Sequence, residues 1–531
     1  MYVIAYDVGT TGLKSCLFEI SKGKPIKLIA GEMGEYDLYI LDNGGVEQDP
    51  AQWWEAMCQT THAILEKTGV APEEIKGISF CAQMQAVVLV DEECNPVMNA
   101  MSYMDNRSVE QMKKGIQTGI KVEGMNAVKL LRSLQLTGAV SASVKDPVWK
   151  YRWVADNDPA AFARVHKWLD VKDFLVAKAC GNFAMSRDSA FATLLYDTRE
   201  GKRGFSKELC DMFDVDMDHL PQIVLSTDRV GGITEKSAAQ LGLCEGTPVF
   251  SGGGDASLIG VGAGAVRIGD THVYIGTSGW VTTVIDRQKL DVGSMIASSV
   301  GVDPDSFNCF AELETAGKCF EWAKKHIMMD DIELFSETKY NVDIETKQLN
   351  AYEYIMRKVA EIPPGSNGVM FTPWLHGNRC PFEDPNARGM FFGIGIETTS
   401  ADMYHAVVEG VCFHLKWQME AMSKLIKPSD AVRFAGGGAI QDQTCQILAN
   451  VLNKKIEVVK QPQNTGAVGA AAMIGIGLGE IESVAAIRDM VEVERSFNPD
   501  PEAAAEYEKL FKLFKELYKD NKQNFKTLHN L

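Results

Sequence analysis

Two short glycine turns with matching sequences constrain the fold more than any other feature of the chain. Gly9-Thr10-Thr11-Gly12 separates two apolar runs at the N-terminus, and Gly276-Thr277-Ser278-Gly279 separates two more in the second half. Two apolar runs joined by a short glycine-containing turn predict a β-hairpin. Backbone N–H groups and hydroxyls at such a turn suit an anionic group, most often phosphate. One copy could be an ordinary hairpin turn, but two copies predict a duplicated fold that holds a polyphosphate from both sides.

The length of the chain predicts more than one domain. Its 531 residues are too many for one compact core. We place the boundary in the glycine-rich stretch 260–269, so that a first domain covers 1–265, a second covers 266–485 and a C-terminal helical extension covers 486–531. Each hairpin is followed by mixed strands and helices, which predicts two α/β domains with a ligand cleft between them.

Three local patterns predict helices. Asp49-Pro50 is a helix-start signal for the amphipathic segment that follows it. Residues 158–180 are expected to be helical. His405 and Glu409 are four residues apart on a probable helix, and we interpret them as an i,i+4 pair on its face.

Two segments of the second half stand apart from this pattern. The stretch 328–350 is polar and acidic, and we interpret it as an insertion or loop. In the extension, apolar side chains recur on one face of a predicted helix, from Tyr507 through Phe511 and Phe514 to Tyr518. This pattern favours a helix that docks on the body of the protein over one that binds a partner.

The charge of the chain excludes some classes of partner. The formal net charge is −18, whereas nucleic acids and anionic membranes need clustered Lys and Arg. A nucleotide is still compatible, because local N–H groups and a metal ion can hold it. The twelve cysteines are scattered with no Cys-x-x-Cys spacing, and we find neither a leader segment nor a membrane-spanning apolar run. We therefore expect a cytoplasmic protein.

Three charged residues near glycine turns are candidates for chemistry. Asp7 ends the first apolar run, where a carboxylate could hold Mg²⁺ directly or through water or could simply cap the turn. Lys14 follows the turn as a phosphate contact or as a solvated strand residue. Asp255 follows a run of glycines after a buried strand, which suits a general base or a solvated loop residue.

A third glycine run points to a nucleotide cradle. Gly436, Gly437 and Gly438 follow an apolar strand and precede a predicted helix over 442–452, with Gln441 between them. A helix N-terminus after glycines can bind an anion or nucleotide, although a tight strand-to-helix connection has the same pattern. The small-residue segment 464–472 predicts a closely packed structural helix. A Walker A pattern, GxGxxG and GxSxG are all absent.

In chain order, these segments resemble the FGGY family of carbohydrate kinases. The matching segments are Asp7–Lys14 for the first phosphate motif, Gly45–Pro50 with Trp53 and Trp54, Met104–Arg107 for a substrate-side element, Gly276–Gly279 for the second phosphate motif, 389–394 with 402–409 for the C-terminal signature, and Gly436–Gly438 with Gln441 for the adenosine motif. Tyr103 stands at or near the usual Trp of the substrate-side element.

The resemblance implies two ribonuclease H-like domains, of the actin-type ATPase kind, that close on ATP, Mg²⁺ and a sugar. It implies Asp255 as general base and Asp7 as the Mg²⁺-associated carboxylate. The implied ATP-binding residues are Gly9, Thr10, Thr11, Lys14, Gly276, Thr277, Ser278, Gly436, Gly437, Gly438 and Gln441. The implied sugar-binding residues are Gln83, Met84, Gln85, Asp105, Arg107 and Asp255.

The substrate is predicted less directly. The elbow after the third strand reads Met-His-Gly in the xylulokinase-like branch of the family but Met84-Gln85-Ala86 here, and the Arg-Glu of the glycerol kinase branch is missing. The segment around Asp255 is closest to the xylulokinase-like branch. We therefore expect transfer of the γ-phosphate of ATP to D-xylulose. The alternatives are ribulose, erythritol or another polyol, glycerol or gluconate as substrate, a non-kinase actin-like ATPase, or a catalytically weak regulatory homologue. A homodimer is the default expectation for a soluble enzyme.

Overall fold

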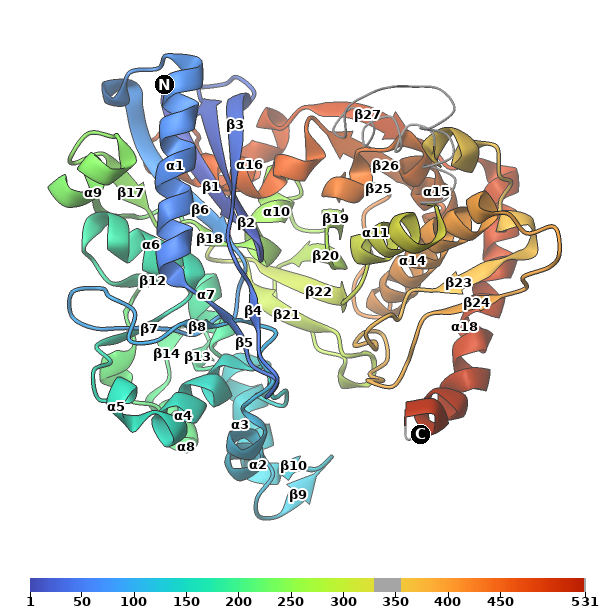
Figure 1. The fold of residues 1–531 in the computed structure, drawn as a ribbon, viewed down its shortest axis with the longest axis horizontal. Helices are drawn as coiled ribbons and strands as arrows, with labels where there is room; N and C mark the ends of the chain where they lie inside the picture. The colour runs from blue at the N-terminus through green and yellow to red at the C-terminus, as the bar shows by residue number, and fades with distance from the viewer. Residues whose placement is uncertain (329–354, 530–531) are drawn as a thin grey trace.

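The computed structural model describes residues 1–328 and 355–529, so the predicted insertion at 328–350 lies almost wholly outside the described residues. Two α/β bodies make up the protein, and each is built on a seven-stranded sheet (Figure 1). The fold class expected from the duplicated turns is confirmed. The predicted domain bounds stay a prediction, because one helix of the second half packs on the first sheet.

The first sheet begins with the predicted hairpin. β1 (Tyr2–Val8) and β2 (Gly12–Glu19) are antiparallel, with Val8 opposite Leu13 across the turn. The strand order is β16-β17-β6-β1-β2-β3, and β18 also pairs with β6. The other strands of this sheet are β3 (Lys27–Glu35), β6 (Ile75–Ala82), β16 (Arg229–Gly232), β17 (Pro248–Phe250) and β18 (Gly253–Gly254).

β1 is buried on both faces, as its continuous apolar sequence requires. Ile4 and Tyr6 point into one hydrophobic core, and Val3 and Ala5 point into another, which is the two-residue alternation of a strand. The first core contains α1 (Pro50–Thr68) and α6 (Val171–Cys180). As predicted, α1 begins at Asp49, whose carboxylate accepts from the Ala51 N–H.

The opposite face of the first sheet is covered by α10 (Asp255–Gly262) and by α16 (Thr465–Gly477). α16 comes from the second half of the chain but lies beside β1 and β6 (Figure 1). A Cβ at Gly469 would lie 2.2 Å from the carbonyl oxygen of Leu258, so small residues are needed where α16 meets α10. The predicted close-packing role of segment 464–472 is confirmed.

The second sheet has the strand order β21-β22-β20-β19-β25-β26-β27. Its centre is the second predicted hairpin, β19 (Thr271–Ile275) and β20 (Gly279–Ile285), and β25 (Ala431–Ala435) runs parallel to β19. The remaining strands are β21 (Ala297–Val300), β22 (Phe307–Leu313), β26 (Lys455–Val459) and β27 (Val493–Phe497). β27 lies within the predicted C-terminal extension, which is therefore not wholly helical.

Helices α11 (Gly317–Ile327), α14 (Ser400–Met422), α15 (Asp442–Leu452) and α18 (Pro501–His529) belong to the second body. α18 runs along its outer side (Figure 1) and buries Tyr507, Phe511 and Phe514 in the hydrophobic core of that body. The predicted docking of the C-terminal helix is confirmed. His405 and Glu409 on α14 form the predicted i,i+4 pair, and both also bond to the hydroxyl of Ser366.

The segment 158–180 was expected to be helical throughout, and this is wrong. β11 (Lys167–Leu169) interrupts it and pairs with β7 (Val88–Val90), because Trp168 and Leu169 are buried there. The other helices are α2 (Val109–Ile116), α3 (Ala127–Thr137), α4 (Pro147–Asn157), α5 (Pro159–Phe162), α7 (Arg187–Ala192), α8 (Lys207–Phe213), α9 (Glu235–Leu241) and α17 (Ile487–Met490). The other strands are β4 (Tyr39–Ile40), β5 (Val46–Gln48), β8 (Ala100–Met101), β9 (Lys121–Val122), β10 (Met125–Asn126), β12 (Ala184–Ser186), β13 (Tyr196–Asp197), β14 (Gly204–Phe205), β15 (Gln222–Val224), β23 (Met370–Thr372) and β24 (Met390–Phe392).

In the described ranges, no helix is both long enough and apolar enough to cross a membrane. All twelve cysteines are free thiols.

Candidate active site

The carbonyl groups of the first glycine turn are held by side chains. The Tyr36 hydroxyl donates to the carbonyls of Gly9 (2.6 Å) and Gly12 (3.0 Å), and the Gln48 amide donates to the carbonyl of Thr10 (2.7 Å). With its acceptors engaged in this way, the turn is left with donor groups to offer an anion. Tyr36 has no recognisable sequence signal, because nothing near it in sequence links it to the turn.

The second glycine turn is held by backbone. The N–H of Gly317, at the start of α11, donates to the carbonyl of Gly276 (2.9 Å), and the N–H groups of Ala316 and Lys318 donate to the carbonyl of Thr277 (3.2 Å each). A Cβ at Gly317 would lie 2.2 Å from the Gly276 oxygen. The start of α11 is therefore a part of the site that sequence reasoning missed.

The third glycine run lies against the second turn. Gly436 has φ 90°, and a Cβ there would lie 2.3 Å from the carbonyl oxygen of Ile275. A Cβ at Gly438 would lie 2.6 Å from the Ile275 Cβ, whereas Gly437 faces open space. Gln441 precedes α15 as its N-cap residue. The structure thus brings together Gly276, Gly436 and Gly438, as the nucleotide prediction requires.

Arg495 on β27 holds the loop after these glycines. Its guanidinium donates to the carbonyls of Ala439 (2.8 Å) and Ile440 (3.1 Å) and pairs with Asp442. The C-terminal extension therefore shapes the loop of the predicted adenosine motif, which no local sequence pattern indicated.

Asp7 and Lys14 are opposite each other on β1 and β2. A Cβ at Gly466 would lie 2.8 Å from Asp7 Oδ2, so the carboxylate lies against the start of α16. Lys14 Nζ donates to the carbonyl of Gln463 (2.9 Å) and is not a freely solvated strand residue. Burial raises the pKa of Asp7, and the charge of Lys14 and a hydrogen bond with Cys81 oppose that rise.

Asp255 is the first residue of α10 and follows β18 directly. Burial raises its pKa to about 7; the N–H of Ala256 opposes this rise, and the charges of Asp7, Glu312 and Asp170 add to it. A carboxylate that titrates near neutral pH is well suited to accept a proton from a hydroxyl.

The backbone before Asp255 is anchored by residues far away in sequence. The Gly254 N–H donates to Asp188 Oδ2 (2.8 Å), and Asp188 is almost completely buried on α7. A Cβ at Gly254 would lie 2.1 Å from the Sδ atom of Met84. Met84 of the predicted sugar elbow therefore packs directly beside the candidate base.

The elbow itself is connected to the first turn. Gln83 is buried and its Nε2 donates to Gln48 Oε1 (2.9 Å), and Gln48 in turn holds Thr10. Within the described part of the chain, Gln83 Oε1 has no hydrogen-bond partner, although buried acceptors are normally satisfied. This oxygen is therefore a hydrogen-bond acceptor at the sugar elbow that lacks a partner among the described residues.

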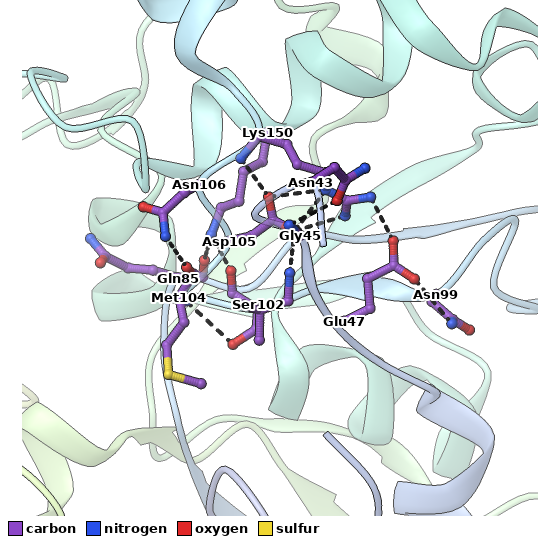
Figure 2. A network of polar contacts seen from close by, with 12 residues as sticks. Asn43, Gly45, Glu47, Gln85, Asn99, Ser102, Met104, Asp105, Asn106 and Lys150 are labelled. Atoms are coloured by element: carbon purple, nitrogen blue, oxygen red, sulfur yellow. Dashed lines mark hydrogen bonds and ion pairs between the residues drawn. The ribbon is translucent and has the colours of Figure 1, made fainter. Parts of the chain in front are cut away.

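Asp105 and Arg107 lie deeper than the sequence analysis expected. Asp105 has no exposed surface, and its carboxylate accepts from the Arg107 guanidinium and from the N–H of Val46 (2.9 Å). Arg107 also pairs with Glu47 (2.7 Å) and stacks over the Trp153 ring. Figure 2 shows Asp105 and Glu47 within this network. Both side chains are occupied, so their contact with a sugar stays a prediction.

Residues from both bodies meet near Asp255. The Tyr103 hydroxyl hydrogen-bonds Thr10 Oγ1 (3.3 Å). Burial is the main cause that raises the pKa of Tyr103, and the charges of Asp255 and Glu312 raise it further. Glu312 belongs to β22 in the second body. Tyr274, directly before the second turn, also has its pKa raised, by burial and then by the charges of Asp7 and Asp255. The two turns and both carboxylates thus share one site between the sheets.

Comparisons with known proteins agree with this geometry. The N-terminal domain of the FGGY family of carbohydrate kinases matches residues 2–262, and the C-terminal domain of that family matches residues 272–478. A xylulose kinase of Staphylococcus epidermidis is 27% identical over 98% of this chain and 97% of its own length. A gluconokinase of Bacillus licheniformis is 26% identical over 97% of this chain and 94% of its own.

The solved structure of a ligand-bound xylulose kinase from Lactobacillus acidophilus has the same fold, with a TM-score of 0.82 at 23% identity and 99% coverage of both chains. The family match spans both bodies and all three glycine motifs. The chain belongs to the FGGY family of carbohydrate kinases.

Proposed function

We propose that this protein transfers the γ-phosphate of ATP to a hydroxyl of D-xylulose and releases xylulose 5-phosphate. The observation that carries the proposal is Asp255: a carboxylate with pKa raised to about 7 lies beside Met84 of the sugar elbow and within electrostatic reach of Asp7 at the first phosphate turn. Full-length relatives named xylulose kinase support the choice of sugar.

In the proposed mechanism, Asp255 accepts the proton of the attacking sugar hydroxyl. The oxygen then attacks the γ-phosphorus, and the bond between that phosphorus and the β,γ-bridging oxygen breaks, so that ADP leaves. The donor groups of the two glycine turns hold the phosphates on either side of the reacting atoms. Catalysis by this arrangement rests on positioning and charge stabilisation, as in other phosphoryl transfers.

Asp7 is the residue that would hold Mg²⁺, which supplies neutralisation of the phosphate charge when bound. The described residues contain no group of three or more acidic, His or Cys side chains arranged as a metal cage. A single carboxylate beside phosphates fits Mg²⁺, because this ion keeps several waters and takes phosphate oxygens as ligands. Lys14 stays a proposed phosphate contact. The hydrogen bond from its ammonium to the Gln463 carbonyl fixes where that ammonium lies.

The charges around Asp255 favour a neutral sugar over gluconate. The charged groups that shift its pKa are the carboxylates Asp7, Glu312 and Asp170. Like charges at close range repel, so a substrate that carries its own carboxylate would bind less well beside them. A neutral ketose avoids this repulsion.

An ADP-release assay with Mg-ATP tests the proposal. D-xylulose, D-ribulose, erythritol, glycerol and gluconate are compared at equal concentrations, with a reaction lacking sugar as control. We expect kcat/KM for D-xylulose to exceed that for the others by at least about tenfold, which corresponds to roughly 1.4 kcal/mol of discrimination. A preference for gluconate, or ADP release that is independent of sugar, would contradict the proposal.

We also propose a cytoplasmic homodimer, a default for enzymes of this kind. Sedimentation equilibrium of the purified full chain tests its oligomeric state.

A further inference from the structure

Gln85, in the sugar elbow, is held in an unusual backbone conformation. Its φ is 65°, a region that residues other than glycine seldom adopt. Two charged side chains hydrogen-bond its backbone, one at the N–H group and one at the carbonyl group. Asp170 accepts from the N–H groups of Gln85 (2.9 Å) and Ala86 (3.1 Å), and Lys150 Nζ donates to the Gln85 carbonyl (2.6 Å). We call Lys150 and Asp170 the elbow clamp.

Both members of the elbow clamp are buried. Lys150 is 0% exposed and Asp170 is 5% exposed. The Lys150 ammonium also donates to the carbonyl of Ser102 (2.9 Å), as Figure 2 shows. Burying an ammonium is unfavourable unless its hydrogen bonds are made, and apolar residues of similar size often serve a core as well or better. A gain in folding stability therefore does not explain why these two charged side chains are buried here.

The elbow clamp lies next to the candidate active site. Met84, the neighbour of Gln85, packs on Gly254 beside Asp255, and the charge of Asp170 reaches Asp255. Through Ser102, Lys150 also ties the elbow to the backbone that leads into Tyr103, whose hydroxyl contacts the first turn. In Figure 2 the side chain of Gln85 extends away from Lys150 and Asp105. Across the described residues, no group hydrogen-bonds the Gln85 side-chain amide.

We propose that the elbow clamp is a positioning device for sugar selection: Lys150 and Asp170 lock the Gln85 backbone so that its free side-chain amide is presented to the sugar. Lys150 and Asp170 act through Gln85 and do not touch the substrate. This inference rests on the proposed sugar kinase function.

The test compares Lys150→Met with a matched control, Lys129→Met. Lys129 is half-buried and its ammonium also donates to a backbone carbonyl, that of Met212 (2.9 Å), which is not part of the elbow. We expect Lys150→Met to raise KM for D-xylulose at least about tenfold and to reduce the preference for D-xylulose over gluconate, with KM for ATP within about twofold of wild type. Lys129→Met should leave both KM values near wild type. Equal effects of the two variants on KM for sugar would overturn the proposal.

A double-mutant cycle with Gln85→Ala separates positioning from general loss of structure. If the clamp acts only through the Gln85 amide, Gln85→Ala and Lys150→Met each raise KM for sugar, and the double variant is no worse than the more affected single variant. Additive effects on KM would overturn the proposal. Should Lys150→Met fail to fold, Asp170→Asn takes its place in the cycle. Asp170 is also the N-cap residue of α6, and Asn keeps its shape and can still cap the helix, while it loses one of the two carboxylate oxygens that accept from the elbow.

The outcome for wild type distinguishes the two proposals. Sugar-independent ADP release, or none with any sugar, defeats the proposed function. Sugar-dependent activity in wild type, together with an additive cycle, defeats the elbow clamp alone.

Discussion

The two glycine turns have nearly the same sequence but are held in different ways. Side chains of Tyr36 and Gln48 engage the carbonyls of the first turn, whereas backbone N–H groups at the start of α11 engage those of the second. Through Gln48 and Gln83 the first turn is continuous with the sugar elbow, while the second packs on the Gly436–Gly438 loop. The two hairpins thus have different surroundings: the first is connected to the predicted sugar elbow, and the second packs on the predicted nucleotide loop.

The candidate reacting carboxylates both belong to the first body. Asp7 is the second-last residue of β1 and Asp255 begins α10, whereas the second body contributes backbone and glycines around its turn. This division predicts that mutations in the first body change chemistry and sugar use, and that mutations in the second change nucleotide use.

The largest effect is expected at Asp255. Asp255→Asn keeps the size of the side chain but removes the base, so we expect kcat to fall by about 10²–10⁴-fold while ADP binding, measured by calorimetry, stays near wild type. Loss of ADP binding in this variant would break the division between the two bodies.

A smaller effect, confined to the nucleotide, is expected at the third glycine run. Gly436→Ala would force a Cβ to within 2.3 Å of the Ile275 carbonyl oxygen at a backbone φ of 90°, so we expect KM for ATP to rise at least about tenfold. Gly395→Ala, also in the second body but outside the glycine motifs, is the matched control, because an added Cβ there meets nothing within 4 Å. An effect of Gly436→Ala on KM for sugar alone would contradict the comparison.

Gln48→Leu tests the link between the first turn and the sugar elbow. The change leaves the Thr10 carbonyl and the Gln83 amide without their partner, and each such loss costs about 1–3 kcal/mol. We expect KM to rise roughly five- to thirtyfold for both ATP and sugar. If steady-state kinetics show a change for ATP only, the two sites are not linked through Gln48.

Tyr36→Phe should give a milder effect on one substrate. The hydroxyl makes hydrogen bonds of 2.6 and 3.0 Å to two carbonyls of the first turn, and a typical net contribution is about 1 kcal/mol. We expect about a fivefold rise in KM for ATP with KM for sugar unchanged. An unchanged KM for ATP would show that the turn keeps its shape without Tyr36.

The smallest effect is a pH-dependent change in stability. The folded-state pKa of Asp255 is raised from 3.8 to about 7, so the folded state binds its proton more tightly than the unfolded state. This contribution is fully present below about pH 4 and is lost as the pH rises through 7. We expect Asp255→Asn to melt a few degrees above wild type at pH 8, on the order of 2 °C, and the two to converge near pH 4. Melting curves that differ equally at both pH values would contradict the raised pKa.

Much of the local structure was predictable because it depends on neighbouring residues. The apolar runs that flank Gly9–Gly12 and Gly276–Gly279 specify hairpins, Asp49-Pro50 specifies the start of α1, and the apolar face of 501–529 specifies a docked helix. The strand β11 within 158–180 was missed because Lys167–Leu169 becomes a strand only by pairing with β7.

Long-range contacts explain what the sequence analysis missed in the site. Asp188 anchors Gly254 from 66 residues away, and Arg495 holds a loop 55 residues before it. In the sequence Lys150 looks like an ordinary helix residue, and only the structure shows that its ammonium reaches the elbow. Asp105 and Arg107 were expected at the sugar, yet their charges are mutually paired within the first body.

The sequence by itself determined the duplicated hairpins, the glycine motifs and the identity of the two candidate carboxylates, because turn geometry and the spacing of apolar residues are local properties. Only the tertiary structure decided how the turns are held, where α16 packs and what grips Gln85. These depend on burial, which shifts the pKa of Asp255 and makes every unpaired polar group costly, and burial arises only when distant segments come together.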